Sequence, residues 1–289
     1  MSVCGAVSHI PIDVAHGLGA LSFDVRLVAG IGILAFTLGL RASSTELSNE
    51  AKEEFLRSAV TVKASRAGKG VTESWRVSLE GSGMTHAASF QSVDERAFIK
   101  DLGNGVKELH FVDSYRYNIA AYRLANLLGL ENLVPVSVER KWRGKLGAMT
   151  WWVDDVMMDE ADLHERGLQA PDQAAWTRRT YRVRVFNELI YDTDRNQSNL
   201  LITKDWNIWV IDCTRAFRRW KTIRRPEWLV RCDRELLRAI SELSRVELDA
   251  ALSDILDDNE LDGVWARRGL IVEHFRTLID ERGEDAVLY

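Results

Sequence analysis

Cysteine is scarce in this chain, and its spacing excludes the usual zinc-binding arrangements. Only three cysteines occur among the 289 residues, no two of them form a C-x-x-C pair, and the six histidines are scattered. Structural zinc sites need clustered Cys and His ligands, so no zinc site is expected. A disulfide between Cys213 and Cys232 and a buried free thiol at Cys213, which lies inside an apolar run, both remain open.

The chain also lacks an excess of positive charge. It carries 38 Lys and Arg against 43 Asp and Glu, which gives a formal net charge of −5. Because nucleic-acid-binding domains need a basic field to neutralise phosphates, nucleic acid is not an expected partner. With 46% hydrophobic residues and only 4 prolines, the composition is that of an ordinary globular protein of one large domain or two small ones.

The apolar run at residues 27–40 is too short to cross a membrane comfortably. It contains 14 uncharged residues, whereas a transmembrane helix needs about 20. Its length fits the hydrophobic region of a signal peptide. Arg26 would be the positively charged flank, and the small residues near Ala42 would be the cleavage site. Residues 1–42 are therefore predicted to be a signal peptide, and the protein to be exported to the periplasm or secreted. The alternative is a retained N-terminal helix, either as a membrane anchor or buried in a cytoplasmic protein.

The periodicity of residues 43–156 predicts a small β-rich lobe. A short capped helix is expected first, and the alternating residues of "SWRVSLEGSGMTHAASFQ" then predict a hairpin. A turn-rich segment from Lys100 to Val106 leads into "DSYRYNIAAYRLANLLGL", whose apolar residues recur at helical spacing until Gly129 stops the helix. Two more strands follow, joined by a turn at residues 143–145.

The remaining residues, 157–289, predict a mainly helical lobe. A long helix, "AAWTRRTYRVRVFNELIY", is followed by a polar cluster and then by a hairpin, "NLLITKDWNIWVID", with its turn at Lys204 and Asp205. From Glu227 onward the pattern is helical and amphipathic. The predicted fold class is α+β, with a small antiparallel sheet and one packed helix in the first lobe and helices in the second.

The polar cluster "YDTDRNQSNLLI" has the residues that phosphoryl transfer needs. That chemistry uses one carboxylate to orient or deprotonate the acceptor and oxygen ligands to hold Mg²⁺ against the phosphates. Asp194 and Asn199 are five residues apart on this segment, and Asp212 ends the following hairpin directly after three apolar residues. A carboxylate in such a position is costly to bury without a cation or strong donors. The alternative is a loop and hairpin with no chemistry.

These residues resemble the catalytic segment of the atypical kinases, which include phosphatidylinositol kinases, HipA-type bacterial kinases and secretory-pathway kinases of the Golgi. The resemblance covers roughly residues 60–220. It implies a two-lobed kinase-like fold in which Asp194 is the catalytic aspartate and Asn199 and Asp212 bind Mg²⁺ or Mn²⁺, with ATP or another nucleotide as the donor. Arg195 is expected to brace the loop or contact a phosphate, and Asp192 to cap the loop.

One pair of charges typical of such kinases is missing. Where the resemblance implies a lysine on the third strand and a glutamate on the packed helix, this chain has Gln91 and Asn118. These two neutral amides can hydrogen-bond to each other, whereas a lone charge there would lack a partner. Gln91, Asn118 and another cation, Lys69 of "AGKGVT", are the candidates for contacting the nucleotide.

The predicted function is that of a kinase-like phosphotransferase with an unknown protein, lipid or sugar acceptor. A second interpretation is a catalytically silent, pseudokinase-like protein that binds a nucleotide, another ligand or a partner. The retained Asp194, Asn199 and Asp212 favour metal binding, and the missing Lys–Glu pair leaves catalysis open.

Overall fold

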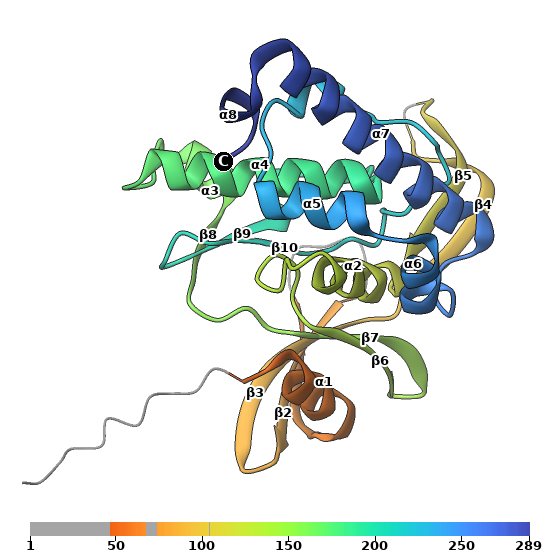
Figure 1. Cartoon of the computed structure of the whole chain (residues 1–289). Helices are drawn as coiled ribbons and strands as arrows, with labels where there is room; N and C mark the ends of the chain where they lie inside the picture. Colours follow the sequence, from red (N-terminus) through yellow and green to blue (C-terminus); the bar gives the residue numbers. More distant parts are fainter. Residues whose placement is uncertain (1–46, 68–73, 104) are drawn as a thin grey trace, which may run out of the picture. The chain divides into compact units, whose positions relative to one another are not determined.

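The computed structural model describes residues 47–67, 74–103 and 105–289 (Figure 1). These residues belong to one compact unit. Residues 1–42, predicted to be a signal peptide or anchor, and the candidate phosphate-contacting Lys69 lie outside the described residues. Within the described ranges, no helix is both long and apolar enough to span a membrane.

The first lobe contains a five-stranded antiparallel sheet with the strand order β1-β2-β3-β7-β6. β2 and β3 form the first predicted hairpin, and φ is positive at Ser82 and Gly83 in its turn. β6 and β7 form the second one around Arg143 and Gly144, where φ is again positive. The strands are β1 (Val60–Arg66), β2 (Ser74–Gly81), β3 (Met84–Gln91), β6 (Ser137–Trp142) and β7 (Lys145–Trp151).

Two helices pack against this sheet. Both α1 (Asn49–Ser58) and α2 (Arg116–Leu127) contact β6 and β7. α2 is the helix predicted from the apolar periodicity. The chain leaves it at Gly129, whose φ of +70° is a conformation that glycine adopts without strain.

A separate two-stranded sheet consists of β4 (Asp94–Asp101) and β5 (Lys107–Ser114). The sequence predicted only the turn between them, so both strands were missed. The exposure of β4 does not alternate: Phe98 and Ile99 are neighbours in the chain and both are largely exposed. In β5 it alternates only from Lys107 to His110. The period-2 signal of a half-buried strand is therefore absent from β4 and short in β5. The hairpin lies beside α7 (Asp258–Arg282), to which Arg96 donates a hydrogen bond at Glu260 (Figure 1).

The second lobe is mainly helical and contains a three-stranded sheet with the order β10-β9-β8. The β9–β10 pair is the predicted hairpin, and the predicted lobe boundary between residues 156 and 157 falls at the start of β8. The elements are β8 (Val156–Asp159), α3 (Glu160–Glu165), α4 (Gln173–Ile190), η1 (Gln197–Asn199), β9 (Leu200–Thr203), β10 (Ile208–Val210), η2 (Pro226–Trp228), α5 (Arg234–Glu242), α6 (Arg245–Leu252), α7 and α8 (Glu284–Val287).

One apolar core continues through both lobes. It includes Leu124 of α2, Val138 of β6, Phe186 of α4 and Phe217 of the segment after β10, all almost completely buried. Because the packed helix of the first lobe shares this core with the second lobe, α2 is fixed against the loops that follow α4 and β10. The observed architecture is the predicted α+β class.

Candidate functional site

The loop that carries Asp194 begins where α4 ends. Asp172 caps the N-terminus of α4 by accepting a hydrogen bond from the Ala175 N–H, and Tyr191 ends the helix in the left-handed conformation, with φ of 49°. The next residue, Asp192, is buried, and its Oδ1 accepts a hydrogen bond from the Asp194 backbone N–H at 3.0 Å. Asp192 therefore caps the loop, as predicted.

Arg195 connects this loop to the segment after β10. Its guanidinium is ion-paired with the buried carboxylate of Asp192. It also donates to the carbonyl oxygens of Ile211 at 2.6 Å and Asn199 at 3.2 Å, and to the Cys213 Sγ at 3.3 Å. Of the two predicted roles, bracing the loop is the one that the structure displays, because these contacts all lie inside the protein.

Asp194 and Asp212 differ in their surroundings. Asp194 is exposed, and none of the described residues donates a hydrogen bond to its carboxylate; partial burial raises its pKa, while the charge of Arg215 opposes that rise. Asp212, in the left-handed conformation with φ of 53°, accepts hydrogen bonds from the Gln91 amide and the Thr214 hydroxyl, both at 3.3 Å. Burial raises the pKa of Asp212, and the hydrogen bond from Gln91 opposes it.

Gln91 and Asn118 are in contact, as the sequence predicted. The Asn118 Nδ2 donates to the Gln91 Oε1 at 2.6 Å, and the Gln91 Nε2 donates to Asp212. On the other side, the Asn118 Oδ1 accepts a hydrogen bond from the Cys213 backbone N–H at 2.7 Å. The side-chain amides of Gln91 and Asn118 thus connect β3, α2 and the end of the β9–β10 hairpin. They hold the backbone next to Asp212 in place.

A cavity of about 210 Å³ brings several predicted residues together. Gln91, Asn118, Asn199 and Asp212 line it, and Trp151 and Trp152 line it as well. Asp194 is not part of its lining but belongs to the same loop as Asn199. Cys213, also in the lining, is a buried free thiol, as is Cys232, so the possible disulfide does not form. Burial raises the pKa of each thiol to about 12.

Two tryptophans, Trp151 and Trp152, form part of the wall of this cavity. Trp151 packs edge-on against Phe55, with ring centroids 5.7 Å apart, and the His86 ring stacks on it at 3.7 Å. Trp152 lies under the Arg76 guanidinium, 4.4 Å from the ring centroid. Core packing therefore explains one face of Trp151, and both residues still contribute to the cavity wall.

Comparison with known proteins identifies the fold. No family model and no curated protein matches the sequence. Among solved structures, hydra Fam20 with sugar superposes with a TM-score of 0.64 at 15% identity, over 85% of this chain and 93% of that one. The Golgi casein kinase gives 0.60 at 12% identity, over 83% and 78% of the two chains. The chain has an atypical kinase-like fold. The Helicobacter pylori proinflammatory kinase CtkA, with a TM-score of 0.50 at 10% identity over 77% and 97%, agrees with this assignment.

In this kinase-like fold, Asp113 is a further candidate for the site, and the sequence prediction did not include it. It lies on β5, its Oδ1 is buried without a hydrogen-bond partner, and its charge raises the pKa of both Asp194 and Asp212. A buried carboxylate oxygen without a partner is an incomplete arrangement that a cation would complete. Asp113 is the first residue of "DSYRYNIAAYRLANLLGL", so the sequence prediction associated it with the start of the helix rather than with the distant Asp212.

The oxygen donors at this site suit a hard divalent cation. Asp113, Asp212 and the Asn199 amide offer carboxylate and carbonyl oxygens, which Mg²⁺ and Mn²⁺ prefer over sulfur. Within the described part of the chain, no group of three His, Cys, Asp or Glu residues is close enough to hold a metal by itself. Kinase-type sites are usually incomplete in this way, because substrate phosphates and water supply the remaining ligands.

Proposed function

We propose that this protein is an atypical kinase-like phosphotransferase that uses a nucleotide, with ATP as the first candidate, together with Mg²⁺ or Mn²⁺. The observation that carries the proposal is the placement of Asn199 and Asp212 in the wall of one cavity, with Asp194 exposed on the same loop. The similarity in fold to a Golgi casein kinase that has been solved with Mn and ADP supports the choice of cofactors.

Each residue has a distinct role in this proposal. Asp212, Asn199 and Asp113 would hold the cation, which would supply the positive charge that neutralises the phosphates. Asp194 accepts the proton of the acceptor hydroxyl. The acceptor oxygen then forms a bond to the γ-phosphorus, and the bond between that phosphorus and the bridging oxygen of the departing nucleoside diphosphate breaks. The pKa of Asp194 is raised, which makes this carboxylate a better proton acceptor than an ordinary aspartate.

Arg195 and the Gln91–Asn118 pair have positioning roles. Arg195 keeps the loop of Asp194 and Asn199 against the backbone that bears Asp212. Gln91 donates to Asp212 and Asn118 holds the next backbone N–H, so both amides orient the carboxylate. No Lys or Arg occurs among the described residues that line this cavity. Phosphate charge would therefore be balanced by the metal, with Lys69 as the predicted further cation.

The experiment is a phosphoryl-transfer assay with ATP and Mn²⁺ or Mg²⁺, using a broad panel of protein, lipid and sugar acceptors. Asp194→Asn should reduce transfer strongly while metal-dependent ATP binding persists, and Asp212→Asn should abolish both. Asp280→Asn, an exposed aspartate on α7, is the control and should leave both unchanged. Transfer that survives Asp194→Asn undiminished would contradict the role given to that carboxylate.

The second candidate function is a catalytically silent kinase-fold protein. It is favoured by one specific observation, the replacement of the usual Lys–Glu pair by the hydrogen-bonded Gln91 and Asn118. This alternative predicts nucleotide or ligand binding without transfer to any acceptor. Wild-type protein that binds ATP with metal but transfers no phosphate would favour it.

We also propose that the mature protein is exported. The support is the sequence of residues 1–42, whose apolar run and flanks are typical of a signal peptide, and the fold similarity to a kinase of the Golgi. Mass spectrometry of the mature N-terminus from native cells tests this proposal. A mature chain that begins near residue 43 would support it, and one that retains residues 27–40 would support the anchored alternative.

A further inference from the structure

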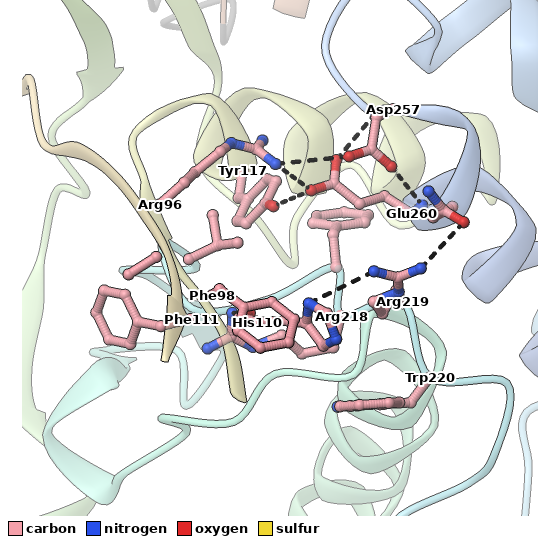
Figure 2. Close-up of a pocket in the computed structure, with 14 residues that line it drawn as sticks. Arg96, Phe98, His110, Phe111, Tyr117, Arg218, Arg219, Trp220, Asp257 and Glu260 are labelled. Atoms are coloured by element: carbon pink, nitrogen blue, oxygen red, sulfur yellow. Dashed lines mark hydrogen bonds and ion pairs between the residues drawn. The ribbon is translucent and has the colours of Figure 1, made fainter. Parts of the chain in front are cut away.

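A second cavity, of about 300 Å³, lies between the β4–β5 hairpin and the N-terminal end of α7 (Figure 2). The first turn of α2 and residues 217–220 complete its walls. It shares no lining residue with the cavity of Asn199 and Asp212, so it is separate from the proposed nucleotide site. Its volume is at the lower end of the range for small-molecule pockets, so it suits a ligand of one or two rings.

Positive charge is in excess in the lining of this second cavity. Its charged residues are three arginines and two carboxylates, namely Arg96, Arg218, Arg219, Asp257 and Glu260. Arg218 is ion-paired with Glu108, which lies outside the lining and also pairs with Arg215. Counting Glu108 therefore means counting Arg215 as well, and the excess of one positive charge remains.

Arg219 is the arginine of this lining whose contacts are all neutral. Among the described residues, its guanidinium contacts only the His110 Nδ1 at 3.5 Å and the Asn259 Oδ1 at 3.3 Å, as the dashed lines in Figure 2 show. A histidine nitrogen accepts a hydrogen bond only when it carries no proton, so His110 is neutral in this contact. These two contacts leave further N–H groups of the exposed guanidinium free, and a carboxylate can accept from two of them at once.

Aromatic rings line the same cavity beside Arg219. At the rim, Phe98 is 69% exposed and Trp220 is 40% exposed. The His110 ring lies between them, with its centroid 5.0 Å from that of Phe98 and 5.9 Å from that of Trp220. The floor is made of buried aromatic rings, those of Phe111, Tyr117 and Phe217.

The free guanidinium and the aromatic rim are directly adjacent. Arg219 contacts His110, the middle ring of the three, and Trp220 is the next residue in the chain. A planar ring that covers Phe98 or Trp220 therefore places an attached acidic group at Arg219. Aromatic rings suit this rim, because pairs of rings attract each other in stacked or edge-to-face arrangements in addition to the apolar area that they bury.

The acidic group that fits best carries a single negative charge. The other arginine at the rim, Arg96, is already ion-paired with Glu260 at 2.8 Å and lies 3.6 Å from Asp257. The Asp257 side chain is 53% exposed in the same lining, so it repels any negative charge beyond the one that Arg219 neutralises. A carboxylate meets this condition, whereas a phosphate monoester is largely a dianion near neutral pH.

We propose that this cavity is a binding site for a small aromatic carboxylate. The carboxylate binds the Arg219 guanidinium, and the ring packs against Phe98 and Trp220. This inference goes beyond the proposed phosphotransferase function and does not rest on it, because the two cavities have no residue in common.

The test compares probes that share one ring system and differ in charge. The affinities of 2-naphthoate, 2-naphthamide and 2-naphthylmethylammonium for the purified protein are measured by NMR titration near neutral pH, at low salt and without nucleotide or metal. Low salt preserves the attraction between exposed charges. The naphthalene ring is common to all three probes, so a difference in affinity reports the charge of the substituent.

Two variants of the cavity are each paired with a control. Arg219→Gln is paired with Arg225→Gln, whose side chain is 53% exposed and lies outside the lining. Phe98→Ala is paired with Ile99→Ala, a neighbour that is 51% exposed and also outside the lining. All four positions are exposed, so each variant should fold, and circular dichroism checks this.

We expect the wild type to bind 2-naphthoate at least about fivefold more tightly than 2-naphthamide, the gain expected for a hydrogen bond to a charged group, and to bind the ammonium probe most weakly. Arg219→Gln should remove the preference for the carboxylate, and Arg225→Gln should retain it. Phe98→Ala should weaken the binding of both the carboxylate and the amide about three- to tenfold, whereas Ile99→Ala should leave it unchanged.

Three results would overturn the inference: no binding of 2-naphthoate by the folded wild type, equal affinities for the carboxylate and the amide, or a preference for the carboxylate that survives Arg219→Gln. Binding that is insensitive to Phe98→Ala would reject the position given to the ring. None of these results would affect the proposed phosphotransferase function, because the assay contains neither nucleotide nor metal.

Discussion

Replacing Arg195 with methionine tests whether this residue braces the loop that carries Asp194 and Asn199 or contacts a phosphate. The Arg195 side chain is about 10% exposed, and the carboxylate of its partner Asp192 has no exposed surface. Removing one member of a buried ion pair leaves the other charge uncompensated and typically costs about 3–5 kcal/mol. Arg195→Met should therefore lower the free energy of unfolding by about that amount, as measured by urea denaturation followed through tryptophan fluorescence.

An exposed arginine provides the matched control. Arg57 forms an i,i+4 pair with Glu53 on α1, and its side chain is 48% exposed. Such surface pairs contribute less than about 1 kcal/mol, so Arg57→Met should be close to the wild type. The double variant Asp192→Asn/Arg195→Met should recover part of the loss, because no buried charge is left unpaired. An Arg195→Met protein of wild-type stability that has lost only its affinity for nucleotide would refute the bracing role.

Three further predictions concern packing, hydrogen bonding and pH. Asn118→Leu should cost about 1–3 kcal/mol of stability, because it leaves the buried Cys213 N–H without its acceptor. Gly263→Ala should lower the free energy of unfolding by about 1–3 kcal/mol, because the new Cβ would lie 2.8 Å from the backbone oxygen of Arg218. Gly269→Ala on the same helix is the control: its Cβ would meet open space, so it should raise the free energy of unfolding by about 0.4–1 kcal/mol. Burial raises the pKa of the Glu160 carboxyl, so the native state binds its proton more tightly than the unfolded state does. The free energy of unfolding therefore falls as pH rises through the native-state pKa of Glu160. Glu160→Gln should therefore be more stable than the wild type near neutral pH, and this advantage should disappear in acid; equal pH profiles in urea denaturation would contradict it.

The sequence predicted the parts of the site that depend on short spacing. Asp194 and Asn199 share one loop, and the hairpin that follows brings Asp212 to the same cavity, so local motif and turn signals were sufficient. The Gln91–Asn118 contact was predictable for a different reason. Two neutral residues replace two charges at positions that a kinase-like fold brings together.

The missed features depend on contacts between distant segments. Asp113 acts on Asp194 and Asp212 from β5. This strand pairs with β4, in which the neighbours Phe98 and Ile99 are both exposed and show no alternating pattern. The cavity lined by Arg96, Trp220 and Glu260 forms only where the β4–β5 hairpin meets the N-terminal end of α7, and no local sequence signal specifies that approach.

Binding of Mn–ATP, measured by isothermal titration calorimetry, tests the central claim that Asp212 forms part of a metal–nucleotide site. The account predicts that the wild type binds ATP only when Mn²⁺ is present, that Asp212→Asn loses this binding, and that Asp280→Asn retains it. Binding of equal strength in the wild type and in Asp212→Asn, or no binding of Mn–ATP by the folded wild type, would contradict the account.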